Sequence, residues 1–257
     1  MDGIEEMEGE PGVAELGVGV DGVDGADLEW LVEQIEAVPG GSAETVDLSG
    51  AAQRWRAAWE AHARAVVILD ALVVRPPWVG SPRSDLPEVV IDPGDAWGHG
   101  GHVTTRLALE LLLAAPWPPG PRVLDVGCGS GVLGIAAARL GARSVRGVDT
   151  DPAALVATVS NAAANGVQVT TLAGLDDAPV GRSDLVVANI EARVLIELAV
   201  GLVAALAPGG HLIVSGFLEE RADEVATAML AAARARLSSL AEISRRSEDG
   251  WVGIELA

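Results

Sequence analysis

Short apolar runs alternate with longer amphipathic segments from residue 66 to the end of the chain. The short runs are rich in valine, leucine and isoleucine, which favours strands, and the longer segments place apolar residues at helical spacing. Strands alternating with helices in this way predict an α/β fold with a doubly wound, mostly parallel sheet. The predicted strands are 66–74, 88–92, 123–126, 145–149, 167–172, 184–188 and 211–216. The predicted helices are 106–115, 132–140, 152–164, 194–206 and 219–236, and a closing antiparallel pair is predicted at 239–244 and 251–256.

The first 50 residues differ from the rest. They hold 14 acidic residues and no basic one, and their first half shows no sustained periodicity. We expect residues 1–50 to form an acidic, loosely ordered segment, because such a composition buries little apolar surface. A folded domain is expected over residues 51–257, with a lead-in of one helix and one strand. In the lead-in helix at 51–64, Trp55 and Trp59 lie one turn apart and are expected to pack on the core.

Charge narrows the classes of partner. The formal net charge is −20, and all 17 basic residues are arginine. Nucleic-acid binding depends largely on basic side chains that neutralise phosphates, so the charge argues against a nucleic-acid partner. It favours a small ligand or a basic partner, such as a basic protein or a small amine.

Cysteine use and hydropathy suggest the compartment. Cys128 is the single cysteine, so no internal disulfide can form, and a reducing cytoplasm fits. The longest apolar stretch, 194–207, contains Glu197 and is too short to span a bilayer. The acidic N-terminus has no apolar signal core. We therefore expect a cytoplasmic protein without a membrane partner.

One stretch carries a binding motif. Val123-Leu124-Asp125-Val126 predicts a strand, and Gly127, Gly129 and Gly131 follow it in a turn that leads into the helix at 132–140. Glycines let the backbone come close to a ligand, and the amide groups at a helix start are available to bind it. Glycine turns of this kind are common, so the motif alone does not identify the ligand.

An acidic residue follows the next predicted strand. Asp149 comes 22 residues after Gly127, where a carboxylate can accept hydrogen bonds from both ribose hydroxyls of a nucleoside. The alternative is a solvated turn aspartate. Asp151, followed by Pro152, is expected to cap the helix at 152–164. Nicotinamide-binding and S-adenosylmethionine-binding proteins share these features, so the two cofactor classes both remain open at this point.

A glycine-rich loop precedes the glycine strand. Residues 92–105 contain four glycines and two histidines, and Thr104 and Thr105 can cap the helix at 106–115. A loop and a helix ahead of the glycine strand are found in many methyltransferases. His99 and His102 are spaced like a pair of metal ligands, but no third ligand is evident, so no metal site is predicted.

Together these segments resemble the ribosomal protein L11 methyltransferases. The resemblance covers residues 52–257. The family pattern is matched at Asp92-Pro93-Gly94, Ala96, Gly98, Gly100, His102, Thr104-Thr105, Val123 to Gly131, Asp149 to Pro152, Asn161 to Val167 and Ala188-Asn189-Ile190. Trp97 stands where the family has Phe, and His99 where it usually has Thr. The family carries an N-terminal recognition domain, for which the acidic residues 1–50 are too few and too polar.

The resemblance implies a class I S-adenosylmethionine-dependent methyltransferase, with a Rossmann-like sheet whose last strand is antiparallel. It implies S-adenosyl-L-methionine as the cofactor. The implied cofactor contacts are Thr105, Gly127, Gly129, Asp149 and Asn189. Such folds usually place acidic residues near the adenine after the third strand, where Asp176 and Asp177 are candidates; the alternative is plain loop acids.

Asn189 is also the candidate catalytic residue. It ends a predicted buried strand and faces the crevice where ligands bind in open α/β sheets. Its amide oxygen can accept a hydrogen bond from an attacking amine and aim the lone pair. The alternative is an asparagine that caps the following helix. Cys128, His62 and His211 are expected to be structural.

The expected function is an N-methyltransferase that acts on protein amino groups. A small-molecule methyltransferase without the recognition domain and a cofactor-binding protein without catalysis are the alternatives. All three share the cofactor site, the first two differ in the methyl acceptor, and the third transfers no methyl group.

Overall fold

A computed structural model of the chain describes residues 2–7, 15–19, 63–92, 100–236 and 240–257. The chain separates into two compact units, Met1–Ala61 and His62–Ala257. In the first unit, β1 (Asp2–Met7) and β2 (Glu15–Gly19) pair as an antiparallel hairpin inside the segment expected to be loosely ordered. The predicted helix at 51–64, its two tryptophans and His62 lie outside the described residues, apart from the last two positions of the helix.

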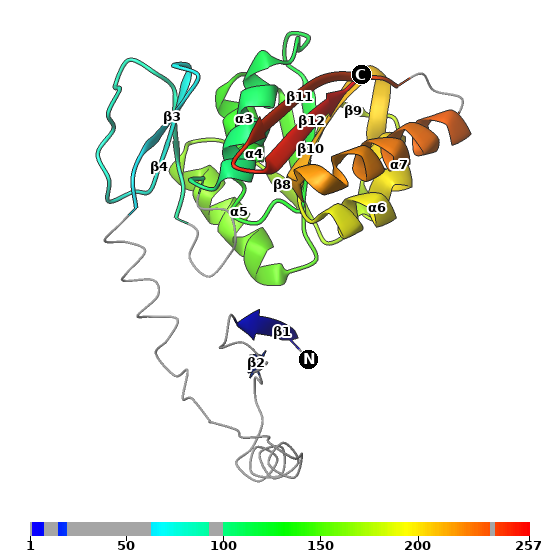
Figure 1. The fold of residues 1–257 in the computed structure, drawn as a ribbon. Helices are drawn as coiled ribbons and strands as arrows, with labels where there is room; N and C mark the ends of the chain where they lie inside the picture. The colour runs from blue at the N-terminus through cyan, green and yellow to red at the C-terminus, as the bar shows by residue number, and fades with distance from the viewer. Residues whose placement is uncertain (1, 8–14, 20–62, 93–99, 237–239) are drawn as a thin grey trace. The chain divides into compact units, whose positions relative to one another are not determined.

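A seven-stranded sheet organises the second unit, in the order β11-β12-β10-β9-β6-β7-β8 (Figure 1). The pairs among β8, β7, β6, β9 and β10 are parallel, whereas β12 runs antiparallel to both of its neighbours. This confirms the doubly wound sheet with an antiparallel last strand. The strands are β6 (Arg122–Val126), β7 (Ser144–Val148), β8 (Thr170–Leu172), β9 (Ser183–Asn189), β10 (Leu206–Leu218), β11 (Glu242–Glu248) and β12 (Trp251–Leu256).

Helices cover both faces of this sheet. They are α3 (Val103–Ala114), α4 (Val132–Arg139), α5 (Pro152–Ala164), α6 (Ala192–Ala205) and α7 (Ala222–Ala235), with 3-10 turns η1 (Leu175–Asp177) and η2 (Glu219–Arg221). Helices α6 and α7 pack on one face, where Leu195 and Met229 are fully buried beside Val186. Helices α3 and α4 pack on the other, where Leu109 and Ile135 are fully buried beside Val187. Alternate residues of one strand thus enter two cores, as the strand period requires. No helix in the described part of the chain is long and apolar enough to cross a membrane.

A smaller sheet precedes the glycine strand. It contains β3 (Val66–Ile68), β4 (Leu72–Arg75) and β5 (Glu88–Val90), with β3 antiparallel and β5 parallel to β4. The single strand expected at 66–74 is therefore wrong. The chain reverses at Leu69 and Asp70, which both have positive φ (46° and 51°), in a turn closed by the Ala71 N–H, which donates to the Ile68 carbonyl at 2.9 Å. The apolar pattern continues through Leu69, although its side chain is 50% exposed, and this conceals the turn.

Two other local expectations have different outcomes. Helix α3 begins earlier than predicted, with His102 as its N-cap, so Thr104 and Thr105 lie inside the first turn and do not cap it. The Nδ1 atom of His102 accepts the Thr104 backbone N–H at 3.3 Å, which serves the function expected of the threonines. The closing hairpin is confirmed, with Asp249 and Gly250 both at positive φ between β11 and β12, but its first strand spans 242–248 where 239–244 was predicted.

Candidate functional site

Most of the predicted site residues lie at the carboxyl ends of three neighbouring strands: Gly127 and Gly129 follow β6, Asp149 follows β7 and Asn189 ends β9, whereas Thr105 lies in α3. From β6 the chain crosses to β7 on one side, and it later returns to β9 on the other side of β6. The strand order therefore reverses between β6 and β9. In open α/β sheets, ligands bind at the carboxyl ends of the strands beside such a reversal.

The glycine turn between β6 and α4 has a conformation that excludes side chains. Gly127 has φ of 70°, and a Cβ at this position would overlap Cγ2 of Ile190. The backbone N–H groups of Gly127 and Cys128 both donate to the Val148 carbonyl, at 2.8 and 3.0 Å. The turn is thereby anchored on β7, and its bare backbone lies next to the end of β9.

Asp149 is joined to this turn. One carboxylate oxygen accepts the Gly129 N–H at 2.9 Å, and the other accepts the Asp151 N–H at 3.0 Å. A carboxylate oxygen has more than one lone-pair site, so each can accept a further hydrogen bond from a ligand hydroxyl. Asp151 caps α5 as expected, accepting the Ala153 N–H at 2.8 Å. Asp151 therefore caps a helix and Asp149 holds the glycine turn, and the ribose-binding role of Asp149 stays a prediction.

Asn189 and Thr105 lie together at the end of β9. The side-chain amide of Asn189 donates to Oγ1 of Thr105 at 3.2 Å, and Thr105 is only 2% exposed. The amide oxygen of Asn189 is buried and has no hydrogen-bond partner among the described residues. Glu191 is the N-cap residue of α6, so the alternative that Asn189 caps that helix is wrong. A buried, unpartnered oxygen costs free energy unless a ligand satisfies it.

Asp125 was not singled out from the sequence, although it is the acid in the middle of the glycine strand. It is 1% exposed, and one oxygen accepts the Gly134 N–H at 2.8 Å. The other oxygen has no hydrogen-bond partner in the described ranges. Burial, together with the nearby charge of Asp149, raises the pKa of Asp125 to about 7.

Cys128 behaves as an inert part of the turn. Burial raises the pKa of its thiol to about 12, so it carries no thiolate at neutral pH. The Thr158 hydroxyl lies 3.3 Å from the sulfur and donates to the Gly129 carbonyl at 2.9 Å. This agrees with the expectation that Cys128 has a structural role.

The remaining candidates are two acidic residues that follow β8 and two histidines. Asp176 and Asp177 are exposed in η1, after β8, and their adenine role stays a prediction. His211 has Nδ1 2.8 Å from Oε1 of the buried Glu255, which fits a structural role. No cluster of three potential metal ligands occurs in the part of the chain that the structure describes, and His99 lies outside it.

An open hollow of the surface, lined by arginines, lies outside the site described above. It contains Arg122, Arg143, Arg146 and Arg182 at the amino ends of the strands, opposite the glycine turn. Arg122 is paired with Asp184 at 2.6 Å, and this pairing lowers the Asp184 pKa to about 2. The hollow therefore contributes nothing to the site described above.

Comparison with known proteins matches most of the chain to one family. The family model described as ribosomal protein L11 methyltransferase (PrmA) matches residues 25–257, so the match begins before residue 52, where the resemblance was expected to start. The ribosomal protein L11 methyltransferase of Methylobacillus flagellatus is 40% identical over 228 residues, covering 84% of this chain and 75% of that protein. That of Symbiobacterium thermophilum is 41% identical over 203 residues and covers 78% of this chain. The chain spans 64% of the length of the Symbiobacterium relative and 64% of that of Ralstonia pickettii.

Solved structures agree with the fold. The ribosomal protein L11 methylase of Lactobacillus delbrueckii subsp. bulgaricus has a TM-score of 0.67 and 31% identity, covering 76% of this chain and 98% of that one. P. horikoshii TYW2 in complex with MeSAdo has a TM-score of 0.54 at 15% identity, which supports the fold alone. The chain belongs to the ribosomal protein L11 methyltransferase family.

Proposed function

We propose that this chain is an S-adenosylmethionine-dependent N-methyltransferase that acts on amino groups of a protein of the ribosomal protein L11 type. The observation that carries the proposal is the position of Asn189. Its buried, unpartnered amide oxygen lies at the same sheet edge as the glycine turn and Asp149. One edge thus holds a nucleoside-binding carboxylate and an acceptor for an amine proton.

The residues of this edge fit the cofactor. The Asp149 carboxylate is held by two backbone N–H groups and keeps acceptor capacity for the ribose hydroxyls. Gly127 has positive φ, and a Cβ there would overlap Ile190, so only glycine keeps this turn conformation beside the end of β9. Gly129 ties the turn to Asp149 through its N–H.

The chemistry asks the protein for positioning. S-adenosylmethionine, when bound, supplies a sulfonium methyl group that is already electrophilic, so no metal ion is needed. Asn189 accepts a hydrogen bond from the neutral amine of the acceptor and aims its lone pair. Thr105 holds the Asn189 amide by accepting its N–H, which leaves the amide oxygen without a protein partner among the described residues and available to the acceptor amine.

The acceptor class rests on two supports. Relatives at 40–43% identity are named ribosomal protein L11 methyltransferases. The net charge of −20 favours a basic acceptor and disfavours a nucleic acid. A cytoplasmic location, where a lone buried cysteine stays reduced, is part of the same proposal.

Substitution of Asp149 tests the cofactor. Asp149→Ala should weaken binding of S-adenosylmethionine and S-adenosylhomocysteine by about 1.5–3 kcal/mol, the range for hydrogen bonds to a charged group. Isothermal titration calorimetry measures the change. Asp151→Ala is the matched control, because it removes the exposed cap of α5 and should cost only about 1 kcal/mol of stability. Tight binding of NAD without a response to the sulfonium cofactor would contradict the proposal.

The acceptor is tested with labelled cofactor and a cell lysate. Transfer of the labelled methyl group to a protein, followed by detection of methylated amino groups, supports the proposal. Label found in small amines points to a small-molecule methyltransferase. Cofactor binding without any transfer points to a binding protein.

A truncation tests the proposed domain division. Deletion of residues 1–48 should leave a folded protein that binds the cofactor, because within the described residues the two apolar cores are formed by positions between Ile68 and Leu256. Thermal melts and cofactor titrations compare the truncated and full chains. A stability loss above about 3 kcal/mol, larger than most single-site effects, would show that the acidic segment is integral to the domain.

A further inference from the structure

Two asparagines, one inside helix α5 and one at its C-cap, have side chains that face the body of the protein. Asn161 lies in α5 and is 4% exposed, and Asn165, four residues further along, is the partly buried C-cap residue of this alanine-rich helix. Burying a carboxamide is costly unless its groups are hydrogen-bonded. The partners of these two side chains therefore show what they are for.

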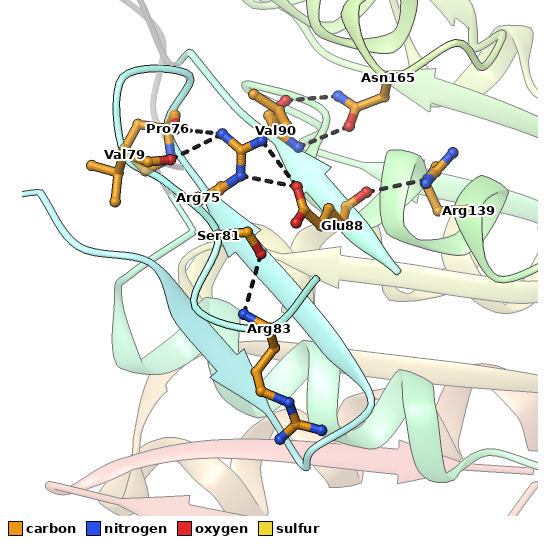
Figure 2. A network of polar contacts seen from close by, with 9 residues as sticks. All are labelled: Arg75, Pro76, Val79, Ser81, Arg83, Glu88, Val90, Arg139 and Asn165. Carbon is orange, nitrogen blue, oxygen red and sulfur yellow. Dashed lines mark hydrogen bonds and ion pairs between the residues drawn. The ribbon is translucent and has the colours of Figure 1, made fainter. Parts of the chain in front are cut away.

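Both asparagines bind the main chain at the end of β5. Asn165 accepts the Val90 N–H at 2.8 Å and donates to the Val90 carbonyl at 2.7 Å (Figure 2). Asn161 accepts the Asp92 N–H at 3.0 Å and donates to the Asp92 carbonyl at 2.9 Å. Each carboxamide thus accepts the N–H and donates to the C=O of a single residue, as a residue of a neighbouring strand would. The spacing matches, because four helical residues rise about 6 Å and two strand residues about 6.7 Å.

These contacts complete an otherwise unpaired strand edge. The opposite edge of β5 pairs with β4, as in the bond from Ile91 N–H to the Arg75 carbonyl at 2.9 Å. On the helix side, the Glu88 carbonyl accepts a hydrogen bond from Nε of Arg139 at 3.1 Å, two residues ahead of the pair between Val90 and Asn165 (Figure 2). The small sheet is therefore attached to α4 and α5 by side chains in place of a further strand.

The two asparagines differ in their last hydrogen bond. The amide of Asn161 also donates to the Ser130 carbonyl, at 2.9 Å, and Ser130 belongs to the glycine turn. The amide of Asn165 donates instead to the Asn161 carbonyl, at 2.7 Å, within its own helix. One turn earlier on the same helix, Thr158 donates to the Gly129 carbonyl. Asn161 joins the glycine turn to β5, whereas Asn165 holds β5 alone.

We propose that Asn161 is a positioning residue for the cofactor-binding turn. Through its bonds to the Ser130 carbonyl and to the Asp92 main chain, it holds the turn 127–131 in its binding conformation before the cofactor arrives. A site held in advance loses less conformational freedom on binding. The inference rests on the proposed function, since it takes the ligand of this turn to be S-adenosylmethionine.

The test compares Asn161→Ala with Asn165→Ala in the full chain. Both remove a clamp on β5, so both should lower the melting temperature, by roughly 4–8 °C. Only Asn161→Ala should weaken S-adenosylhomocysteine binding, by about tenfold, which corresponds to about 1.4 kcal/mol. Asn165→Ala should stay within about twofold of the unmodified protein, well below the tenfold step. Equal losses of affinity in the two variants would overturn the proposal.

Hydrogen exchange supplies a second measurement that needs no cofactor. The Val90 and Asp92 amides should exchange faster in both variants, because the shared clamp is weakened. The Gly129 and Gly131 amides should exchange faster in Asn161→Ala only. If exchange in the turn is unchanged in Asn161→Ala, the proposal is overturned even if the cofactor assignment is correct. If exchange there is faster in Asn161→Ala only, the proposal is supported even if S-adenosylhomocysteine fails to bind the unmodified protein. If Asn161→Ala does not fold, Asn161→Ser is compared in the same way.

Discussion

Asn189→Ala is expected to lower kcat by roughly 100-fold, the size of loss that follows when a reacting group is misplaced. The cofactor affinity should change by less than about threefold, because the interaction is made with the acceptor amine and tightens in the transition state. The structural basis is the buried amide oxygen, which has no partner among the described residues while the amide nitrogen is held by Thr105. Single-turnover kinetics with saturating cofactor measures the change.

Thr105→Val is the matched control for this prediction. It keeps the shape of the side chain and removes the oxygen that accepts the Asn189 N–H at 3.2 Å. The Asn189 amide then loses its orientation but remains present, so kcat should fall less than in Asn189→Ala. An unchanged kcat in Asn189→Ala would remove Asn189 from the chemistry. A loss of cofactor affinity equal to the loss of rate would make it a binding residue only.

Features determined by neighbouring residues could be predicted from the sequence. The Asp151-Pro152 start of α5 and the turn at Asp249-Gly250 follow from local rules for caps and hairpins, and both are confirmed. The doubly wound sheet follows from the alternation of strands and helices. Local rules were insufficient at Leu69, where an apolar residue adopts positive φ in a turn that the hydrophobic pattern conceals.

Features that join distant residues could not be predicted in this way. The pairing of Asn161 with Asp92 spans 69 positions, and that of Asn189 with Thr105 spans 84. The segment from Asn161 to Val167 matches the family pattern, but a single sequence does not indicate which backbone groups the Asn161 amide will bind. Two asparagines four apart on a helix facing the core were the available signal. Their cost of burial implies partners, although it does not name them.

Asp125 also escaped prediction because its environment is created by the fold. In the sequence it is one acid between apolar strand residues, and such a residue can be exposed at an edge strand. In the structure, β6 is central, with β7 and β9 on either side, and Asp125 is 1% exposed. The raised pKa follows from this burial and from no local sequence rule.

The pH dependence of stability should reveal this buried acid. Asp125 has a pKa of about 7 in the folded protein, above its ordinary value of 3.8. Between these pH values the folded state binds more protons than the unfolded state, so stability falls as pH rises and the loss is complete above about pH 7. A shift of about three pKa units corresponds to at most about 4 kcal/mol.

Asp125→Asn should remove this loss, because an amide carries no charge at any pH. Its oxygen can still accept the Gly134 N–H, so the turn keeps its anchor. Denaturant unfolding between pH 5.5 and 9 should show stability falling through pH 7 in the unmodified protein and a flatter profile in the variant. The test uses the slope of stability against pH and not the absolute stability, because the buried NH₂ group of the new asparagine can lower stability equally at every pH.

Asp184→Asn gives the control of opposite sign. Hydrogen bonds from Arg122 hold the Asp184 pKa at about 2, below its ordinary value of 3.8, so its stabilisation is present above pH 3.8 and lost as pH falls towards 2. Asp184→Asn should therefore lower stability by about the same amount at every pH from 5.5 to 9 and leave the slope unchanged.

Parallel pH profiles for Asp125→Asn and the unmodified protein would show that Asp125 is not the buried acid that titrates near neutrality.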